Sequence, residues 1–189
     1  MGIVERAKNI LLSPNTEWPV IAAEQTNVGT LYNTYIGPMA AIGPVCSLLA
    51  LVMFFGGMGI GAGMFGLAIL YLINLAATYI VALIVQALAP QFGGRADIVG
   101  ALKLVAYSYT PAWVGGFFNL IPSLAILALL LSLYGFYLFY AGATPVVNVP
   151  KEKAVTFTVV MVIVMIVVFV ITGFILSAIA GAGMVGMMG

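Results

Sequence analysis

The sequence contains no histidine, a single cysteine, and charged side chains at only 6% of its 189 positions. Histidine is the commonest acid–base group and a frequent transition-metal ligand, so its absence removes most familiar catalytic and metal sites. One cysteine, Cys46, cannot form an internal disulfide or a cysteine-ligated metal site. A net charge of +1 gives no support for nucleic-acid binding. We therefore expect no cofactor, no metal and no nucleic-acid partner.

Apolar residues dominate what is present. They make up 64% of the chain, with a mean hydropathy of +1.23, whereas a soluble domain carries roughly a quarter charged residues. Five runs are long enough to cross a hydrocarbon core, which takes about 20 helical residues. Their limits lie near 36–57, 64–89, 98–118, 122–143 and 154–180. The sequence thus predicts an all-α membrane protein with a bundle of five transmembrane helices over residues 36–189, after a cytoplasmic or interfacial segment, 1–35.

The positions of the basic residues check this span count. The chain has six of them, namely Arg6, Lys8, Arg95, Lys103, Lys151 and Lys153. With five crossings, all six lie on one side of the membrane, whereas the loops 57–63 and 119–121 and the tail after 181 carry no charge. Basic residues in short loops tend to stay cytoplasmic. We therefore expect the N-terminus in the cytoplasm and the C-terminus on the far side.

The first 35 residues read as a cap on the bundle. Their opening part ends at Ser13-Pro14 and lacks the sustained apolar run of a cleaved export signal, so we expect it to be retained. Glu17 and Trp18 combine a charge with an aromatic ring, which is typical of a short helix at the headgroup level. Tryptophan is common at membrane interfaces as a plain anchor, and we favour that interpretation for this segment.

The second predicted span carries a polar stripe. At 100° per residue, Tyr71, Asn74, Thr78, Ala82 and Gln86 fall within about a third of the helix circumference. Such a stripe should face other helices, because unpaired amides are costly in hydrocarbon. Interhelical hydrogen bonds that fix the packing would explain it, and so would the lining of a polar path.

The third predicted span holds the densest polar sequence of the chain. Its polar or helix-interrupting residues are Lys103, Tyr107, Ser108, Tyr109, Thr110 and Pro111. Lys103, Tyr107 and Thr110 share one helical face, directed inward from the cytoplasmic end. Asp97 is expected to be the N-cap, with Lys103 snorkelling to the same interface. Pro111 should kink the helix. The freed polar groups could bind a ligand or satisfy one another.

Catalysis finds little support in these residues. Ser108 and Lys103 point about 140° apart around a regular helix, so they cannot form a catalytic dyad. The carboxylates fall outside the predicted hydrocarbon core, with Glu24 as the exception if the N-terminal segment folds back into the bundle. We therefore expect that the protein is not an enzyme.

Four motifs, in this order and spacing, resemble the Ypt-interacting protein (YIP) family. They are Leu12-Ser13-Pro14-Asn15-Thr16-Glu17-Trp18, Ala106-Tyr107-Ser108-Tyr109-Thr110-Pro111, Leu120-Ile121-Pro122 and Val149-Pro150-Lys151-Glu152-Lys153-Ala154. The resemblance implies five membrane passes and a cytoplasmic N-terminus. Eukaryotic members are associated with vesicle traffic and Rab-type GTPases through a long N-terminal region. With only 35 residues before the first predicted span, this chain resembles the short bacterial branch, which implies the bacterial cytoplasmic (inner) membrane; a eukaryotic endomembrane is the alternative.

Two functional hypotheses follow. The first is a non-enzymatic membrane protein that acts through its helical bundle and organises the lipid bilayer, a membrane-protein partner or a second copy of the chain. The alternative is a small channel or transporter for a neutral or weakly polar solute or lipid. That alternative predicts a continuous path between spans two and three, lined by Asn74, Thr78, Tyr107 and Thr110.

Overall fold

A computed structural model describes residues 2–56 and 60–186, and these residues form helices and connecting turns without any strand. Residues 57–59 of the predicted loop 57–63, and 187–189 of the tail, lie outside the described ranges. The long helices are α4 (Gly37–Phe55), α5 (Ile60–Leu88), α6 (Ile98–Gly115), α7 (Ala125–Val147) and α8 (Lys151–Gly186). The shorter ones are α1 (Ile3–Leu12), α2 (Pro14–Ala23), α3 (Val28–Leu31), the π-helical turn η1 (Tyr32–Ile36) and the 3₁₀ turns η2 (Ala89–Phe92), η3 (Gly116–Leu120) and η4 (Pro122–Leu124).

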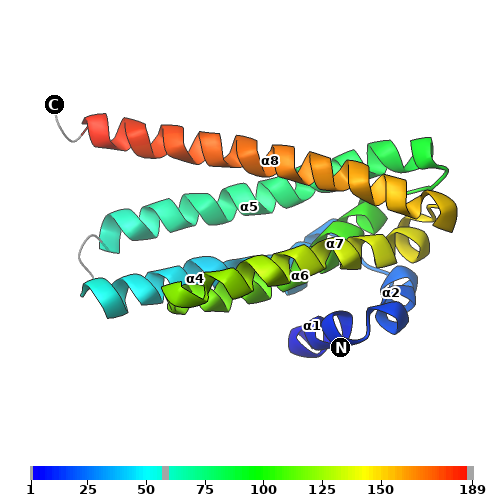
Figure 1. Ribbon diagram of the computed structural model, residues 1–189, viewed down its shortest axis with the longest axis horizontal. Coiled ribbons are helices and arrows are strands. Elements are labelled where there is room, and N and C mark those ends of the chain that lie inside the picture. The colour runs from blue at the N-terminus through cyan, green and yellow to red at the C-terminus, as the bar shows by residue number, and fades with distance from the viewer. Residues whose placement is uncertain (1, 57–59, 187–189) are drawn as a thin grey trace.

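The long helices run side by side and alternate in direction along the chain (Figure 1). The α5–α6 and α7–α8 connections lie at one end of the bundle, at which α1 and α2 also pack. The α6–α7 connection and the end of α8 lie at the other end. This is the arrangement that five consecutive rods with short connections would produce, and it brings the charged connections 93–97 and 148–153 together.

The two connections at the charged end are tied to each other. The backbone N–H of Arg95 donates to the carbonyl of Val147 at 2.8 Å. A Cβ at Gly94 would lie 2.6 Å from that same carbonyl oxygen, so only glycine permits the approach. Gly93 and Asn148 both adopt left-handed backbone angles, with φ of 82° and 56°, as is typical at helix C-termini.

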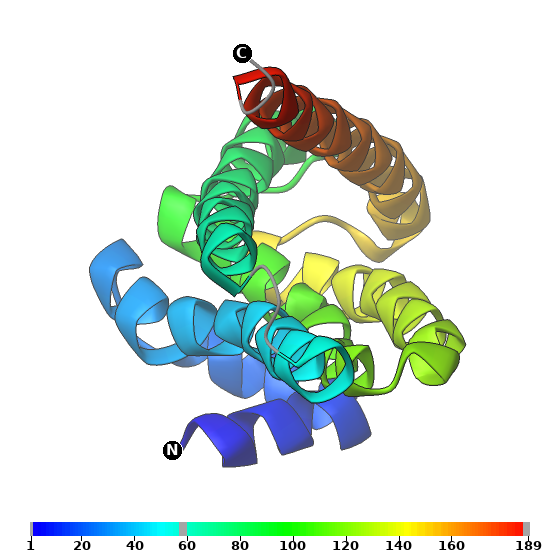
Figure 2. The same cartoon turned by 90° about the vertical axis from the view of Figure 1, so that its left-hand side faces the viewer.

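Helix α6 lies at the centre of the molecule. Twelve of its 18 residues are buried, and it packs against α1, α2, α3, α4, α5 and α7. Figure 2 shows this arrangement along the bundle axis, with α8 separated from the N-terminal helices. Because protein rather than lipid surrounds α6, its sequence can carry polar side chains that a lipid-facing helix could not.

Among the residues that the structure describes, four helices are long and apolar enough to cross a membrane, namely Val28–Phe54, Gly63–Phe92, Ile126–Val147 and Lys151–Phe174. The five-span prediction is therefore matched in four places, and its third span corresponds to α6, which is not among them. Lys103 and the polar run 107–110 lower the mean hydropathy of that helix. The first membrane helix also begins at Val28, earlier than the predicted residue 36.

Helices α1 and α2, from Ile3 to Ala23, form a helical hairpin that packs on the side of the bundle. Helix α1 lies crosswise to the long helices in both views (Figures 1 and 2). Ala7 and Ile10 on α1, and Trp18 and Ile21 on α2, are buried against the bundle. Pro14 occupies the first turn of α2, where its missing N–H costs nothing. The hairpin is therefore part of the hydrophobic core.

Candidate functional site

The inward face predicted for α6 is confirmed. Lys103, Tyr107 and Thr110 are all buried, and each faces a segment from the N-terminal part of the chain. Lys103 faces the end of α2, Tyr107 faces both the hairpin and η1, and Thr110 faces η1. The polar groups of α6 therefore meet the chain's own first 36 residues.

Lys103 caps the C-terminus of helix α2. Its Nζ donates to the carbonyl of Ile21 at 2.8 Å and also to the carbonyl of Glu24. The last carbonyls of a helix have no partner within the helix and carry partial negative charge, so a buried ammonium group is well placed there. The prediction that Lys103 snorkels to the interface is wrong: its residue is only 5% exposed, because the hairpin covers it.

Arg6 lies between two carboxylates, that of Glu17 on α2 and that of Glu24 at the C-terminal end of α2. Its guanidinium nitrogens are 2.5 Å from one oxygen of Glu17 and one of Glu24. The Arg6 and Glu17 side chains are each 8% exposed, whereas that of Glu24 is 47% exposed. Together with Lys103, the group has two positive and two negative charges, so it is neutral overall. A buried charge requires this kind of pairing.

Aromatic rings join these charges to the interior of the bundle. The Arg6 guanidinium carbon lies 5.9 Å from the centre of the Tyr107 ring, within the range of a cation–π contact. Tyr107 also packs edge-on against Trp18, with 6.3 Å between ring centres, and at a tilt of 49° against Tyr35, with 4.4 Å between ring centres. The Tyr35 hydroxyl then shares a 2.7 Å hydrogen bond with Thr110. We call the eight residues the hairpin cluster: Arg6, Glu17, Trp18, Glu24, Tyr35, Lys103, Tyr107 and Thr110.

Trp18 occupies a notch on α7 that a glycine leaves open. A Cβ at Gly142 would lie 2.7 Å from two Trp18 ring atoms and 2.6 Å from Leu104 Cδ1. Trp18 is fully buried and Glu17 nearly so. The sequence predicts both at the headgroup level; their side chains instead face protein, because the hairpin packs its apolar side on α6 and α7.

Within the described chain, two buried side-chain polar atoms lack a hydrogen-bond partner, the indole nitrogen of Trp18 and the hydroxyl of Ser108. The backbone carbonyl of Ser108 would be 2.7 Å from a Cβ at Gly135 of α7. Tight packing of α6 on α7 therefore surrounds Ser108. No histidine exists to activate this hydroxyl.

The other α6 residues singled out in the sequence, Asp97, Tyr109 and Pro111, contribute to the structure of the helix or its packing. The prediction that Asp97 is the N-cap is confirmed, since its carboxylate accepts the Gly100 N–H at 2.7 Å. Tyr109 packs edge-on against Trp113 at 5.9 Å between ring centres. Pro111 lies inside a helix that continues to Gly115, and the kink expected at Pro111 stays a prediction.

The polar stripe of α5 is divided between burial and exposure. Thr78 and Ala82 are fully buried, and Gln86 is partly buried. Asn74 is more exposed than these three residues, yet its side chain makes the interhelical contact expected of the stripe. Its amide oxygen still accepts a 3.4 Å hydrogen bond from the Trp113 indole, which joins α5 to α6. The Thr78 hydroxyl donates to the backbone carbonyl of Asn74 at 2.9 Å.

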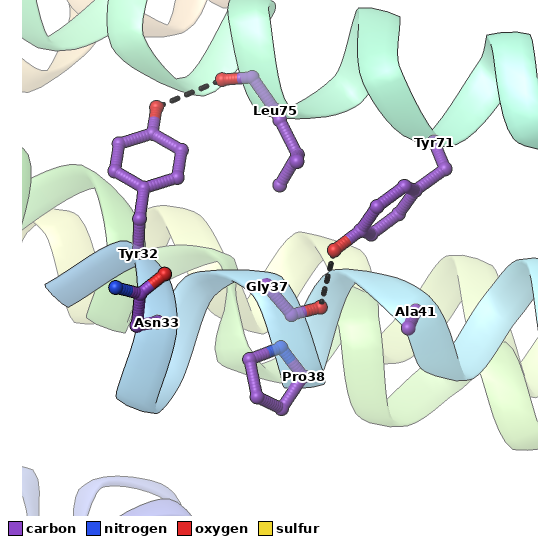
Figure 3. A pocket seen from close by; sticks show the side chains of 7 residues that line it. All are labelled: Tyr32, Asn33, Gly37, Pro38, Ala41, Tyr71 and Leu75. Carbon is purple, nitrogen blue, oxygen red and sulfur yellow. Dashed lines mark hydrogen bonds between the residues drawn. The ribbon is translucent and has the colours of Figure 1, made fainter. Parts of the chain in front are cut away.

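An open-sided pocket lies between the η1–α4 segment and α5 (Figure 3). Its lining residues are Tyr32, Asn33, Gly37, Pro38, Ala41, Tyr71 and Leu75. None of the four residues predicted to line a transport path is among them. Thr78, Tyr107 and Thr110 are instead buried in side-chain contacts or hydrogen bonds.

Sequence reasoning missed Arg6 and Tyr35 as members of the hairpin cluster. Arg6 is separated from Glu17 by 11 positions and from Glu24 by 18, so no helical spacing signals the pairing. Tyr35 falls at the start of an apolar run, where an aromatic belt already explains it. The only available signal was conditional: Glu24 would enter the bundle if the N-terminal segment folded back.

Among the described residues, no group of three or more acidic, cysteine or histidine side chains is placed to hold a metal ion. The family model for the Yip1 domain matches residues 8–172. Neither the comparison with curated proteins nor the comparison with solved structures gave a match. The matched region runs from α1 through most of α8 and includes all of the hairpin cluster except Arg6. The chain belongs to the Yip1 domain family.

Proposed function

We propose that this Yip1-family chain is a non-enzymatic membrane protein whose helical bundle organises the membrane or membrane-protein partners. The observation that carries the proposal is the closed hairpin cluster. The polar face of α6 is the part of the chain best suited to meet a substrate. Its Lys103 ammonium and Thr110 hydroxyl are bonded to groups of the same chain. We therefore assign the functional contacts of the protein to the outer surfaces of the bundle.

Those outer surfaces are apolar on several helices. Exposed large side chains include Met53 on α4, Phe65 on α5 and Phe169 on α8. In a membrane, such faces contact lipid or other helices through close packing rather than through a hydrophobic driving force. The proposal therefore assigns the contacts with lipid, with a membrane-protein partner or with a second copy of the chain to these faces.

In this proposal α6 is the third of five crossings, although its own hydropathy is low. The alternating helix directions in Figure 1 and the shared location of the charged connections support that count. Basic residues favour the cytoplasmic side, and we therefore propose that the N-terminus lies in the cytoplasm and the C-terminus on the far side. The bacterial cytoplasmic membrane is the proposed location, and a eukaryotic endomembrane is the alternative.

A flux assay tests this proposal against the transport alternative. The chain is reconstituted into proteoliposomes, and the uptake of a neutral solute such as glycerol is compared with that of empty vesicles. We expect vesicles that contain the wild type or Thr110→Val to take up glycerol no faster than empty vesicles. The Thr110 hydroxyl is already bonded to Tyr35 and so is not free to line a path. A reproducible flux in the wild type that Thr110→Val abolishes would reject the proposal.

Photo-crosslinking tests the organising role itself. A photoreactive phenylalanine analogue replaces Phe169, which is exposed on α8, or Phe139, which is fully buried on α7. We expect discrete protein adducts in native membranes from the exposed position and none from the buried one. Adducts of twice the chain mass would identify a second copy as the partner. Absence of discrete adducts from Phe169 and from equivalent exposed positions on α4 and α5 would contradict the proposal.

A further inference from the structure

Helix α1 reaches partway down the side of the bundle from its charged end. On α7, the Tyr134 hydroxyl donates to the backbone carbonyl of Leu11 at 3.0 Å. Tyr134 precedes the end of α7 at Val147 by 13 positions, which is about 20 Å of helix. On α6, the Arg6 guanidinium lies over Tyr107, which follows the start of that helix by nine positions, or about 14 Å. Both long helices therefore place α1 about 14–20 Å from the charged end (Figure 1).

The outer surface of α1 carries charges as well as apolar side chains. Glu5 and Lys8 are exposed on it, and so are Val4 and Leu12. A mixed surface of this kind is typical of a helix among lipid headgroups, and a charge is costly in hydrocarbon. Helix α1 therefore requires water or headgroups at a level where α6 and α7 are still in mid-helix.

The other boundary of the bundle lies close to this level. Tyr134 follows the first residue of α7, Ala125, by nine positions, which is about 14 Å of helix. The connection from α6 to α7 contains the 3₁₀ turns η3 and η4, and it exposes the polar side chains of Asn119 and Ser123. Irregular backbone is tolerated at membrane depth only where protein buries it or water reaches it. Two surfaces that require water are thus about 14 Å apart along α7, roughly half of the 30 Å hydrocarbon core.

The opposite side of the molecule has a longer apolar surface. Helix α8 begins at the charged end, and no charged residue follows Lys153 in the sequence. Large apolar side chains are exposed along it from Val155 to Phe174, a length of about 28 Å. Figure 2 shows α8 on the other side of the molecule from α1. The apolar surface therefore matches a full hydrocarbon core at α8 and about half a core beside α1.

A tilt of the whole bundle does not remove this difference. The separation between α1 and the α6–α7 connection is set by the length of α7, and a tilt shortens its projection on the membrane normal. A flat bilayer that met α1 at its cytoplasmic boundary would place the α6–α7 connection about 16 Å inside the far boundary, in hydrocarbon. The polar residues of that connection make such a position costly.

We infer that the chain thins the bilayer beside α1 and α7. Water and phospholipid headgroups of the cytoplasmic leaflet dip to α1, and those of the far leaflet dip to the α6–α7 connection. Glu5 and Lys8 offer one charge of each sign to these headgroups. The inference rests on the organising role proposed above and names local bilayer thickness as what is organised. That role is judged by the protein adducts expected from Phe169, so the role and the thinning can fail separately.

Spin-label accessibility in proteoliposomes tests this inference. The full chain, in a Cys46→Ala background, is reconstituted into palmitoyl-oleoyl phosphatidylcholine vesicles with one nitroxide at Lys8→Cys, Ser123→Cys, Val155→Cys or Val159→Cys. Circular dichroism checks that each variant folds. Val155 and Val159 are exposed on α8, about 6 and 12 Å from its start and so nearer the charged end than α1. We expect collisions with a water-soluble nickel chelate at Lys8 and Ser123, and with oxygen at both positions on α8.

Each arrangement of a flat bilayer gives a different result. A flat bilayer that begins at the charged end predicts oxygen collisions at Lys8 as well as on α8. One that begins at the level of α1 predicts chelate collisions at Val155 and Val159. A tilted bundle in a flat bilayer predicts oxygen collisions at Ser123. Any of these three results would overturn the inference.

Replacing the exposed charges of α1 tests what holds water at this depth. The nitroxide is placed at Val4→Cys, on the exposed surface of the same helix. Glu5→Leu combined with Lys8→Leu should change its collisions from the chelate toward oxygen, because an apolar surface no longer excludes acyl chains. Lys151→Leu combined with Glu152→Leu removes the same two charges from exposed positions at the charged end and should leave the Val4 label unchanged. Equal chelate accessibility at Val4 in all three chains would overturn the assignment of the thinning to α1.

Discussion

The Nζ atom of Lys103 lies 2.8 Å from the carbonyl oxygen of Ile21, so a side chain of the central helix α6 caps the C-terminus of α2. This contact links positions separated by 82 residues and is buried. It makes the α1–α2 hairpin an integral part of the bundle rather than a surface appendage. Several consequences of that attachment can be measured.

Replacing Lys103 should loosen the hairpin. Lys103→Met removes the donor to two carbonyls at the end of α2 and leaves them without that partner. A hydrogen bond from a charged group contributes about 1.5–3 kcal/mol, so we expect a lower melting temperature in detergent and faster proteolysis within the α1–α2 hairpin. Lys151→Met removes an exposed lysine and should melt like the wild type. Equal melting of the two variants would contradict the capping role.

Arg6 and Glu17 should show strong coupling in a double-mutant cycle. Arg6→Met leaves the Glu17 carboxylate buried and unpaired, which costs about 3–5 kcal/mol for a buried pair. Arg6→Met combined with Glu17→Leu should regain most of that loss, since both charges are then gone. Chemical denaturation in detergent measures the free energies of unfolding.

The matched control for this cycle lies on the exposed side of α1. Glu5 and Lys8 are both exposed there, and removing either charge should change the free energy of unfolding by less than about 1 kcal/mol. Additive effects of Arg6→Met and Glu17→Leu would show that the buried pair is not coupled.

Trp18 should report on the notch at Gly142. Gly142→Ala places a methyl group 2.7 Å from the Trp18 ring, so the ring must move. In a Trp113→Phe background, we expect the emission of Trp18 to shift to longer wavelength, and the overpacked variant to lose about 1–3 kcal/mol of stability. Gly173→Ala is the control, because no atom lies within 4 Å of its added Cβ. An unchanged spectrum in Gly142→Ala would contradict this packing.

Two facing glycines at the other end of the bundle should respond differently to the same substitution. A Cβ at Gly116 would lie 2.7 Å from Gly43 Cα and 2.8 Å from Gly43 N, which are backbone atoms that cannot rotate away. A Cβ at Gly43 would come no closer than 3.7 Å to the nearest atom, the amide nitrogen of Asn119. Thermal melting should therefore show Gly116→Ala destabilised and Gly43→Ala unchanged or stabilised by up to about 1 kcal/mol. Equal changes in melting temperature for the two variants would mean that α4 and η3 are farther apart than the structure places them.

Local patterns in the sequence predicted what depends on local physics. The apolar runs located the long helices, and Asp97 was identified as an N-cap because that role needs only the next three residues. The inward face of α6 followed from helical periodicity, which places Lys103, Tyr107 and Thr110 together. These inferences required no knowledge of which helices meet.

Long-range pairing could not be predicted in the same way. The partner of Lys103 is a backbone carbonyl of α2, a group that every residue possesses, so no side-chain pattern marks it. The early start of the first membrane helix at Val28 was missed because Asn33 and Thr34 interrupt its apolar run. The expectation that Asn74 pairs with another helix is met by its hydrogen bond with Trp113, but its position on the stripe did not identify that partner.

The most direct test of the account is the sidedness of three positions. Single cysteines at Lys8, Lys151 and Ser123, each in a Cys46→Ala background, are labelled with a membrane-impermeant maleimide in intact cells and in inverted vesicles. All three positions are exposed. If α6 crosses the membrane, Lys8→Cys and Lys151→Cys react only from the cytoplasmic side and Ser123→Cys only from outside. Labelling of Ser123→Cys on the same side as Lys8→Cys, or of Lys8→Cys and Lys151→Cys on opposite sides, would contradict the five-helix arrangement.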